Sequence, residues 1–249
     1  MKLRWPGLVR RVCWRLHAST LDVRPWCALA DELPNRCRIA IVGNAGYLAD
    51  ADLGEQIDSC DLVVRMNNFQ LRGFERSIGR RTDVFITNFS RSTMSFDNPH
   101  ARAARWIVSS RPMNFRRRRD LGVPDRLGEH VSAGMSALGA SQVFVPSLEY
   151  FAAQVGRFGT YPTTGMMALQ LAIDVLAPRV SQLFLAGFSF FQGRSHYFSD
   201  RTVDAALWHN VDGERQAFRD VAIRSAAWIQ VDPIMQKHLE TEACEHGSV

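Results

Sequence analysis

The chain has 249 residues, of which 46% are hydrophobic and 22% are charged. This length is enough for one sizeable α/β domain, and the composition excludes both a disordered chain and a collagen-like fibre. The formal charge of +5 favours an anionic partner, such as a nucleotide sugar, an anionic lipid surface or nucleic acid, without choosing among them.

Residues 1–34 are predicted to form a basic amphipathic N-terminal segment. Within residues 1–20, arginines interrupt every apolar run, so no membrane-spanning anchor or cleavable signal is expected there. Tryptophan, leucine and valine accompany these arginines, which suits peripheral contact with an anionic membrane. A helix that packs on the rest of the domain would show the same pattern, so both interpretations stay open.

Residues 35–249 are predicted to form one Rossmann-like α/β domain with a mainly parallel sheet and helices on both faces. Six apolar runs separated by longer segments indicate its strands. The predicted strands begin at Arg38 and then cover residues 61–69, 82–87, 105–110, 142–147 and 182–191. Residues 164–177 have apolar side chains at helical spacing and are predicted to form a buried helix.

The first predicted strand ends in a turn of sequence Gly43-Asn44-Ala45-Gly46. Parallel α/β sheets bind ligands at the carboxyl ends of their strands, and backbone N–H groups in such a turn can face a phosphate. The turn lacks the GxGxxG spacing, so a turn without a ligand is the alternative interpretation.

A second turn, Tyr161-Pro162-Thr163-Thr164-Gly165, leads directly into the predicted helix. Hydroxyl groups and free N–H groups at the positive end of a helix stabilise an anion. Threonine at this place also commonly serves only to cap the helix, so anion binding and capping both stay open.

Two histidines, His196 and His209, lie in a polar stretch after the last predicted strand. Near neutral pH, one histidine can take a proton from an attacking hydroxyl, and a protonated histidine can stabilise negative charge on a leaving phosphate. Taken alone, each of them is more typical of an ordinary surface or loop histidine.

The sequence gives little support for a metal site. Asp50-Ala51-Asp52 has the D-x-D spelling of metal-dependent sugar transferases, but it follows the glycine turn within the next helix or loop. We interpret it as solvated surface and expect neither a metal nor another cofactor. The five cysteines contain no CxxC pair, so they indicate neither a disulfide framework nor a zinc site, and a reducing compartment fits best.

Four motifs, in order, resemble those of the animal-type sialyltransferases, glycosyltransferase family 29, across about residues 38–215. RIAIVGNAGYLADADLGEQIDSCDLVVRMN, continuing to GFERSIGRRTDVF, resembles the family's long sialyl motif. YPTTGMMALQLAIDVL followed by LAGFSF resembles the short motif, with Thr163 in place of the usual serine. HYF at 196–198 resembles the third motif, from which Ser199 departs, and His209 with Glu214 reproduces the very short motif.

The resemblance implies a GT-A-like Rossmann variant without a D-x-D metal site. It also implies an inverting transfer of sialic acid from CMP-sialic acid to a hydroxyl of a glycan or glycolipid acceptor. The donor site implied by the motifs consists of Gly43, Asn44, Ala45, Gly46, Asn67, Thr163, Thr164 and Gly165, with both asparagines on the nucleotide.

The resemblance further implies the catalytic residues. His209 would be the general base on the acceptor hydroxyl, and His196 would bind or protonate the departing phosphate. Glu214 and Tyr197 would support the site rather than take part in the proton transfer.

Departures from the family bear on the compartment. Its secreted-pathway members usually join the long and short motifs by a disulfide, and this chain has Ile39 and Leu176 at the matching positions. Both side chains are apolar, so packing in the core would replace the bridge. A cytoplasmic enzyme of bacterial type, peripheral on the inner face of the membrane if residues 1–20 bind lipid, is the resulting hypothesis.

Other interpretations stay open. CMP-Kdo carries the same carboxylate beside its anomeric carbon as CMP-sialic acid, and the motifs do not distinguish the two donors. Arg111 and the run Arg116 to Arg119, around Phe115, would suit nucleic acid, but no nucleic-acid-binding module accompanies them, and we expect no nucleic-acid partner. The donor carboxylate, an anionic acceptor and lipid headgroups are the alternative ligands of these arginines. A catalytically inactive binding subunit is disfavoured because both histidines are present.

Overall fold

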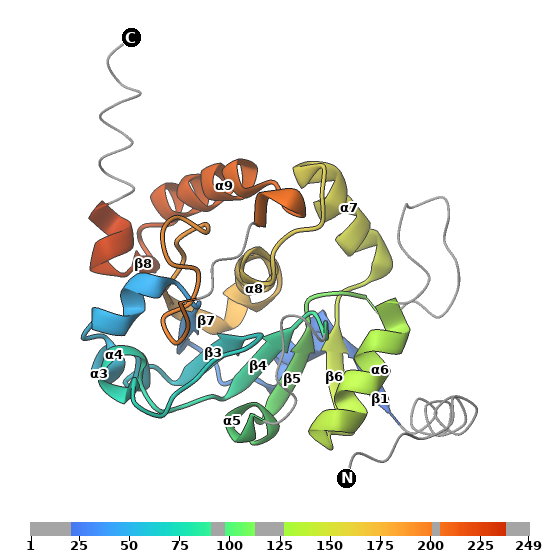
Figure 1. Ribbon diagram of the computed structural model, residues 1–249. Helices are drawn as coiled ribbons and strands as arrows, with labels where there is room; N and C mark the ends of the chain where they lie inside the picture. Colours follow the sequence, from blue (N-terminus) through green and yellow to red (C-terminus); the bar gives the residue numbers. More distant parts are fainter. Residues whose placement is uncertain (1–20, 91–97, 113–126, 201–204, 238–249) are drawn as a thin grey trace.

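The computed structural model describes residues 21–90, 98–112, 127–200 and 205–237 (Figure 1). The strands in this part of the chain are β1 (Asp22–Pro25), β2 (Cys37–Val42), β3 (Leu62–Met66), β4 (Val84–Thr87), β5 (Trp106–Ser109), β6 (Gln142–Val145), β7 (Val180–Ala186) and β8 (Ile229–Val231). The α-helices are α2 (Trp26–Glu32), α3 (Gly54–Asp58), α4 (Glu75–Ile78), α5 (Pro99–Arg102), α6 (Leu127–Leu138), α7 (Leu148–Phe158), α8 (Thr164–Leu171) and α9 (Val211–Arg224). Shorter helical turns are η1 (Gly46–Asp50), η3 (Ala172–Leu176), η4 (Ala177–Arg179) and η5 (Ala205–Leu207).

The strands form one parallel sheet in the order β1-β6-β5-β4-β3-β2-β7-β8. From β2 the chain proceeds outward through β3, β4, β5 and β6, and it then returns to place β7 on the other side of β2. The winding direction therefore reverses between β2 and β7. A crevice at the carboxyl ends of two such strands is the usual ligand site of an open parallel sheet.

Two apolar cores cover the two faces of the sheet, as Figure 1 shows for the helices above and below it. One core joins α2, α7, α8 and α9 to the sheet, and it contains Trp26, Phe151, Met167 and Phe218. The other joins η1, α3, α4, α5 and α6 to the opposite face. A parallel sheet covered on both faces needs strands without polar alternation, and β3 and β4 are buried throughout.

The predicted α/β architecture is confirmed, with two local differences. The helix predicted over 164–177 is α-helical only to Leu171 and then continues as the π turn η3 and the 3₁₀ turn η4. The strand predicted over 182–191 ends at Ala186 because the chain turns at Gly187, whose φ of +78° suits glycine.

Residues 22–32, which were assigned to the N-terminal segment, form edge strand β1 and helix α2. β1 pairs with β6, and Trp26 on α2 is buried and donates from Nε1 to the carbonyl of Ser109. The expected membrane contact through residues 1–20 and the run Arg116 to Arg119 lie outside the described residues. In the part of the chain that is described, no helix has the length and apolar character needed to cross a membrane.

The positions that match the family disulfide are both in the core. Ile39 on β2 and Leu176 in η3 are almost fully buried, and they belong to the same apolar cluster. Cys27, Cys37 and Cys60, the cysteines within the described ranges, are free thiols.

Candidate functional site

A pocket lies at the point where the winding of the sheet reverses. Its walls come from the segments that follow β2, β3 and β7, from the turn before α8, and from the first turn of α9. The lining includes Gly43, Asn44, Ala45, Asn67, Thr163, Thr164, Gly165, His196 and Glu214. Residues predicted from four separate motifs therefore meet in one pocket.

The glycine turn after β2 is in close contact with the turn after β7. The Gly43 N–H donates to the Ala186 carbonyl at 2.8 Å, and the Ala45 N–H donates to the Gly187 carbonyl at 3.1 Å. A Cβ on Gly43 would lie 2.2 Å from the Gly187 carbonyl oxygen, so no larger residue fits there without moving backbone. Gly46 is not in the pocket lining; it begins η1 and packs against Arg194.

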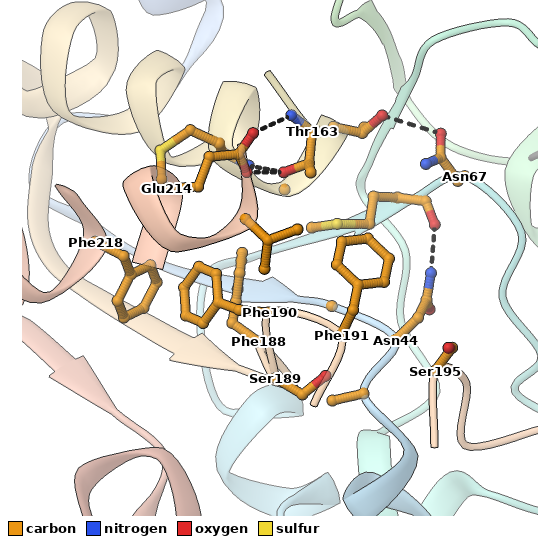
Figure 2. Close-up of a pocket in the computed structure, with 18 of the residues that line it drawn as sticks. Asn44, Asn67, Thr163, Phe188, Ser189, Phe190, Phe191, Ser195, Glu214 and Phe218 are labelled. Carbon is orange, nitrogen blue, oxygen red and sulfur yellow. Dashed lines mark hydrogen bonds between the residues drawn. The ribbon is translucent and has the colours of Figure 1, made fainter. Parts of the chain in front are cut away.

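The two predicted asparagines are fixed by hydrogen bonds across strand ends, as Figure 2 shows. Asn44 donates from Nδ2 to the Met66 carbonyl at 3.1 Å. Asn67 Oδ1 accepts from Thr87 Oγ1 at 3.2 Å and from Thr164 Oγ1 at 3.4 Å. Asn67 has a φ of +50°, a left-handed conformation that asparagine tolerates better than most residues.

Thr163 caps α8, and Glu214 on α9 holds this cap. Thr163 Oγ1 accepts from the Met166 N–H at 3.1 Å, which is the capping bond. The Glu214 carboxylate accepts from the Thr163 N–H at 2.7 Å and from its hydroxyl at 2.5 Å. Glu214 is 1% exposed, and burial raises its pKa to about 7, although both bonds from Thr163 favour the ionised form. Both of these hydrogen bonds of the Glu214 carboxylate are therefore with Thr163, the residue that caps α8.

The third motif divides between the pocket and the core. His196 lines the pocket, whereas Tyr197 is fully buried in the core on the other side of the sheet. The Tyr197 hydroxyl donates to the Gln70 carbonyl at 2.8 Å and accepts from the Gln70 N–H at 3.0 Å. Its own N–H donates to the Asn44 carbonyl at 3.1 Å, so it links this loop to the glycine turn.

His209 does not line the pocket, but it lies beside the turn that forms one wall. It is partly buried, and its Nδ1 is 2.6 Å from the Tyr161 carbonyl, two residues before Thr163. Since a carbonyl oxygen only accepts, Nδ1 carries the proton and Nε2 has the free lone pair in the neutral ring. Burial lowers the pKa of His209, and the positive charge of Arg111 lowers it further, whereas the Tyr161 bond opposes them. The lowered pKa favours the neutral ring, which is the form that can accept a proton at Nε2.

Aromatic side chains form a wall of the pocket that sequence reasoning missed. Phe188 and Phe190 pack against Phe218 of α9, with ring centroids 5.3 Å and 5.2 Å apart, and Phe191 lies between this group and Asn44 (Figure 2). Phe190 and Phe191 have φ of +47° and +61°, which is uncommon for bulky residues. Their apolar run was read as strand, so the sequence offered no signal for this turn.

Asp232, at the end of β8, is a second residue that sequence reasoning missed. It is fully buried, and its Oδ2 accepts from the Tyr47 hydroxyl at 2.7 Å and from the Gly187 N–H at 3.0 Å. Oδ1 accepts from the N–H groups of Ile234 and Met235. Asp232 thus fixes the peptide of Gly187, which in turn contacts the glycine turn.

Asp52 of the D-x-D sequence forms a surface ion pair with Arg76 at 2.8 Å. Within the described ranges, no group of three or more histidine, cysteine, aspartate or glutamate side chains is placed to hold a metal ion.

Comparison with known proteins relates this site to one family. Residues 18–116 match the sequence model of glycosyltransferase family 29 (sialyltransferase). The human type 2 lactosamine alpha-2,3-sialyltransferase is 27% identical over 238 residues, covering 84% of this chain and 68% of that protein. The human CMP-N-acetylneuraminate-beta-1,4-galactoside alpha-2,3-sialyltransferase is 49% identical over 53 residues, covering 21% of this chain and 14% of that protein.

Two crystal structures show the same fold. One of a mammalian sialyltransferase gives a TM-score of 0.59 at 19% identity and covers 93% of this chain and 81% of its own. The other, of a mammalian sialyltransferase in complex with Gal-beta-1-3GalNAc-ortho-nitrophenol, gives a TM-score of 0.58 at 19% identity. It covers 88% of this chain and 77% of its own. The match over residues 18–116 and the sialyltransferase relatives make this chain similar to the sialyltransferases of glycosyltransferase family 29, and the two crystal structures show that it shares their fold.

Proposed function

We propose that this chain transfers sialic acid from CMP-sialic acid to a hydroxyl group of a glycan acceptor. The family 29 domain and the sialyltransferase relatives support a CMP-sugar-dependent glycosyltransferase. The observation that carries the proposal is the meeting of the glycine turn, the threonine turn and His196 in one pocket where the sheet reverses its winding.

The donor nucleotide would occupy the pocket between the two turns. The phosphate of CMP would lie toward the N-terminus of α8, where Thr164 and Gly165 present the positive end of the helix. Asn44 and Asn67 would contact the rest of the nucleotide from the ends of β2 and β3. His196 would stabilise the negative charge that develops on the departing phosphate.

His209 would act as the general base. The acceptor oxygen attacks the anomeric carbon and its proton passes to Nε2, while the bond from that carbon to the phosphate oxygen breaks and CMP leaves with the electron pair. A neutral imidazole with Nδ1 fixed on Tyr161 has its free lone pair at the other nitrogen, as this role requires. Attack from the face opposite the leaving group inverts the anomeric centre.

The test measures CMP release from CMP-sialic acid with a lactosamine acceptor, together with CMP affinity by calorimetry. His209→Ala should lower kcat about a hundred- to ten-thousand-fold and leave the dissociation constant of CMP nearly unchanged. The matched control is His100→Ala, since His100 is exposed on α5 under the opposite face of the sheet. Wild-type transfer rates in His209→Ala would defeat the assignment.

Two finer points of the proposal have their own tests. CMP carries one phosphate and needs less charge neutralisation than a diphosphate, so we expect activity to persist in excess EDTA; its loss, with recovery on adding Mg²⁺ or Mn²⁺, would contradict this. Parallel assays with CMP-Kdo decide the donor, because a higher kcat/KM with CMP-Kdo would replace sialic acid in the proposal.

A further inference from the structure

Arg111 lies two residues after the end of β5, at the carboxyl edge of the sheet. Its main chain is fixed by Ser109, whose hydroxyl donates to the Arg111 carbonyl at 2.6 Å and accepts from the Arg111 N–H at 3.1 Å. Its guanidinium is partly buried and faces the Tyr161 ring, with Cζ 5.9 Å from the ring centroid. The side chain is therefore directed toward the turn that forms a wall of the pocket.

The guanidinium of Arg111 has no hydrogen-bond acceptor or carboxylate partner among the residues that the structure describes. By comparison, the buried Arg65 on β3 donates to the carbonyls of Arg81 and Ile78. Arg81 in turn pairs with Asp83. Burial lowers the pKa of Arg111, and none of its five guanidinium N–H donors is used by a residue that the structure describes.

Arg111 is also close to the proposed base. Tyr161 connects the two residues, because its ring lies under the guanidinium and its carbonyl accepts from His209 Nδ1. The positive charge of Arg111 contributes to lowering the pKa of His209. An anion bound by Arg111 would therefore lie beside the reacting atoms.

We propose that Arg111 binds a sugar carboxylate in the substrate complex. This inference rests on the proposed function, in which the carbon attacked by the acceptor carries a carboxylate directly. That carboxylate is bonded to the anomeric carbon, which is attacked by the acceptor oxygen that His209 deprotonates. The planar guanidinium of arginine binds carboxylates through two parallel hydrogen bonds. An acidic sugar of the acceptor glycan, held on the same side of the base, would supply the same chemistry.

The first experiment compares CMP with a donor analogue, CMP-3-fluoro-sialic acid, which carries the carboxylate and is transferred very slowly. Arg111→Met should weaken binding of this analogue about ten- to hundredfold and leave the dissociation constant of CMP within about twofold. Arg111→Lys, which keeps the charge and loses the two-bond geometry, should recover part of the affinity. Arg157→Met is the matched control, since Arg157 lies exposed over the ring of Phe158 at 5.2 Å and should change neither constant.

The second experiment distinguishes the two sources of the carboxylate. If Arg111→Met leaves the donor analogue unaffected but raises KM for a sialylated lactosamine and not for the neutral one, the acceptor supplies the carboxylate. If the wild type binds CMP and Arg111→Met shows neither effect, this inference is overturned and the proposed function still stands. Equal weakening of CMP and the analogue also overturns it, because it marks a structural role. Absence of CMP binding by the wild type refutes the proposed function and this inference with it.

Discussion

Replacement of Glu214 by glutamine removes a carboxyl group that is 1% exposed and bonded twice to Thr163. Burial raises the pKa of this carboxyl from 4.5 to about 7 in the folded protein. Between these two values the folded protein binds a proton that the unfolded chain has released. Stability therefore falls as the pH rises through this window, and the loss approaches about 3 kcal/mol above pH 7.

Glutamine keeps the shape of the side chain and does not titrate. Its oxygen can accept from the Thr163 N–H and its amide can donate to the Thr163 hydroxyl, so the cap of α8 survives. Glu214→Gln should therefore lose the part of the pH dependence that the carboxyl causes. The difference in unfolding free energy between wild type and variant should change by about 2.5 kcal/mol from pH 5 to pH 8, in favour of the variant at high pH.

Urea unfolding at fixed temperature, followed by tryptophan fluorescence at half-unit pH steps, measures this difference. Asp212→Asn serves as the control, because Asp212 is an exposed carboxylate on the first turn of the same helix and pairs only with Arg215 among the described residues. A difference between wild type and Glu214→Gln that stays constant within about 0.5 kcal/mol over this range would refute the reasoning.

Three further predictions concern the pocket. Gly43→Ala should weaken CMP binding at least about tenfold, measured by calorimetry, because its Cβ would lie 2.2 Å from the Gly187 carbonyl oxygen; unchanged affinity would show that the turns can separate. Asp232→Asn should cost about 2–3 kcal/mol in urea unfolding, because an amide N–H would face the Gly187 N–H; a cost below about 0.5 kcal/mol would contradict this. Burial and Arg111 lower the pKa of His209, so the fall of kcat/KM toward acid should lie at lower pH than an ordinary histidine gives; Arg111→Met should move that fall to higher pH, and an unmoved profile would count against the coupling.

The interior strands were predictable from sequence and the edge strands were not. β3 and β4 are buried throughout and β2 is buried from Ile39 to Val42, so these strands consist mostly of apolar residues. β1 reads DVRP with mostly exposed side chains, and β8 has three residues. β1 and β8 lie at the two edges of the sheet, where each strand pairs on one side only, and neither has an apolar run that marks it in the sequence.

The site was predictable where a motif fixes the backbone. The glycine and threonine turns carry local signals, because glycine permits close approach and threonine caps a helix, and both turns reach the pocket. Asp232 gives no local signal, since its partners Tyr47 and Gly187 are distant in sequence. The left-handed backbone of Phe190 and Phe191 is set by packing against Phe218, which only the folded chain shows.

The bond between Tyr47 and Asp232 spans 185 residues. During synthesis the glycine turn leaves the ribosome first, and the carboxylate that supports it emerges only 185 residues after Tyr47. A nascent chain halted before residue 232 would hold the first strands and still lack a finished nucleotide pocket. Capacity to bind CMP should therefore arise only once Asp232 has emerged, rather than grow with each added strand.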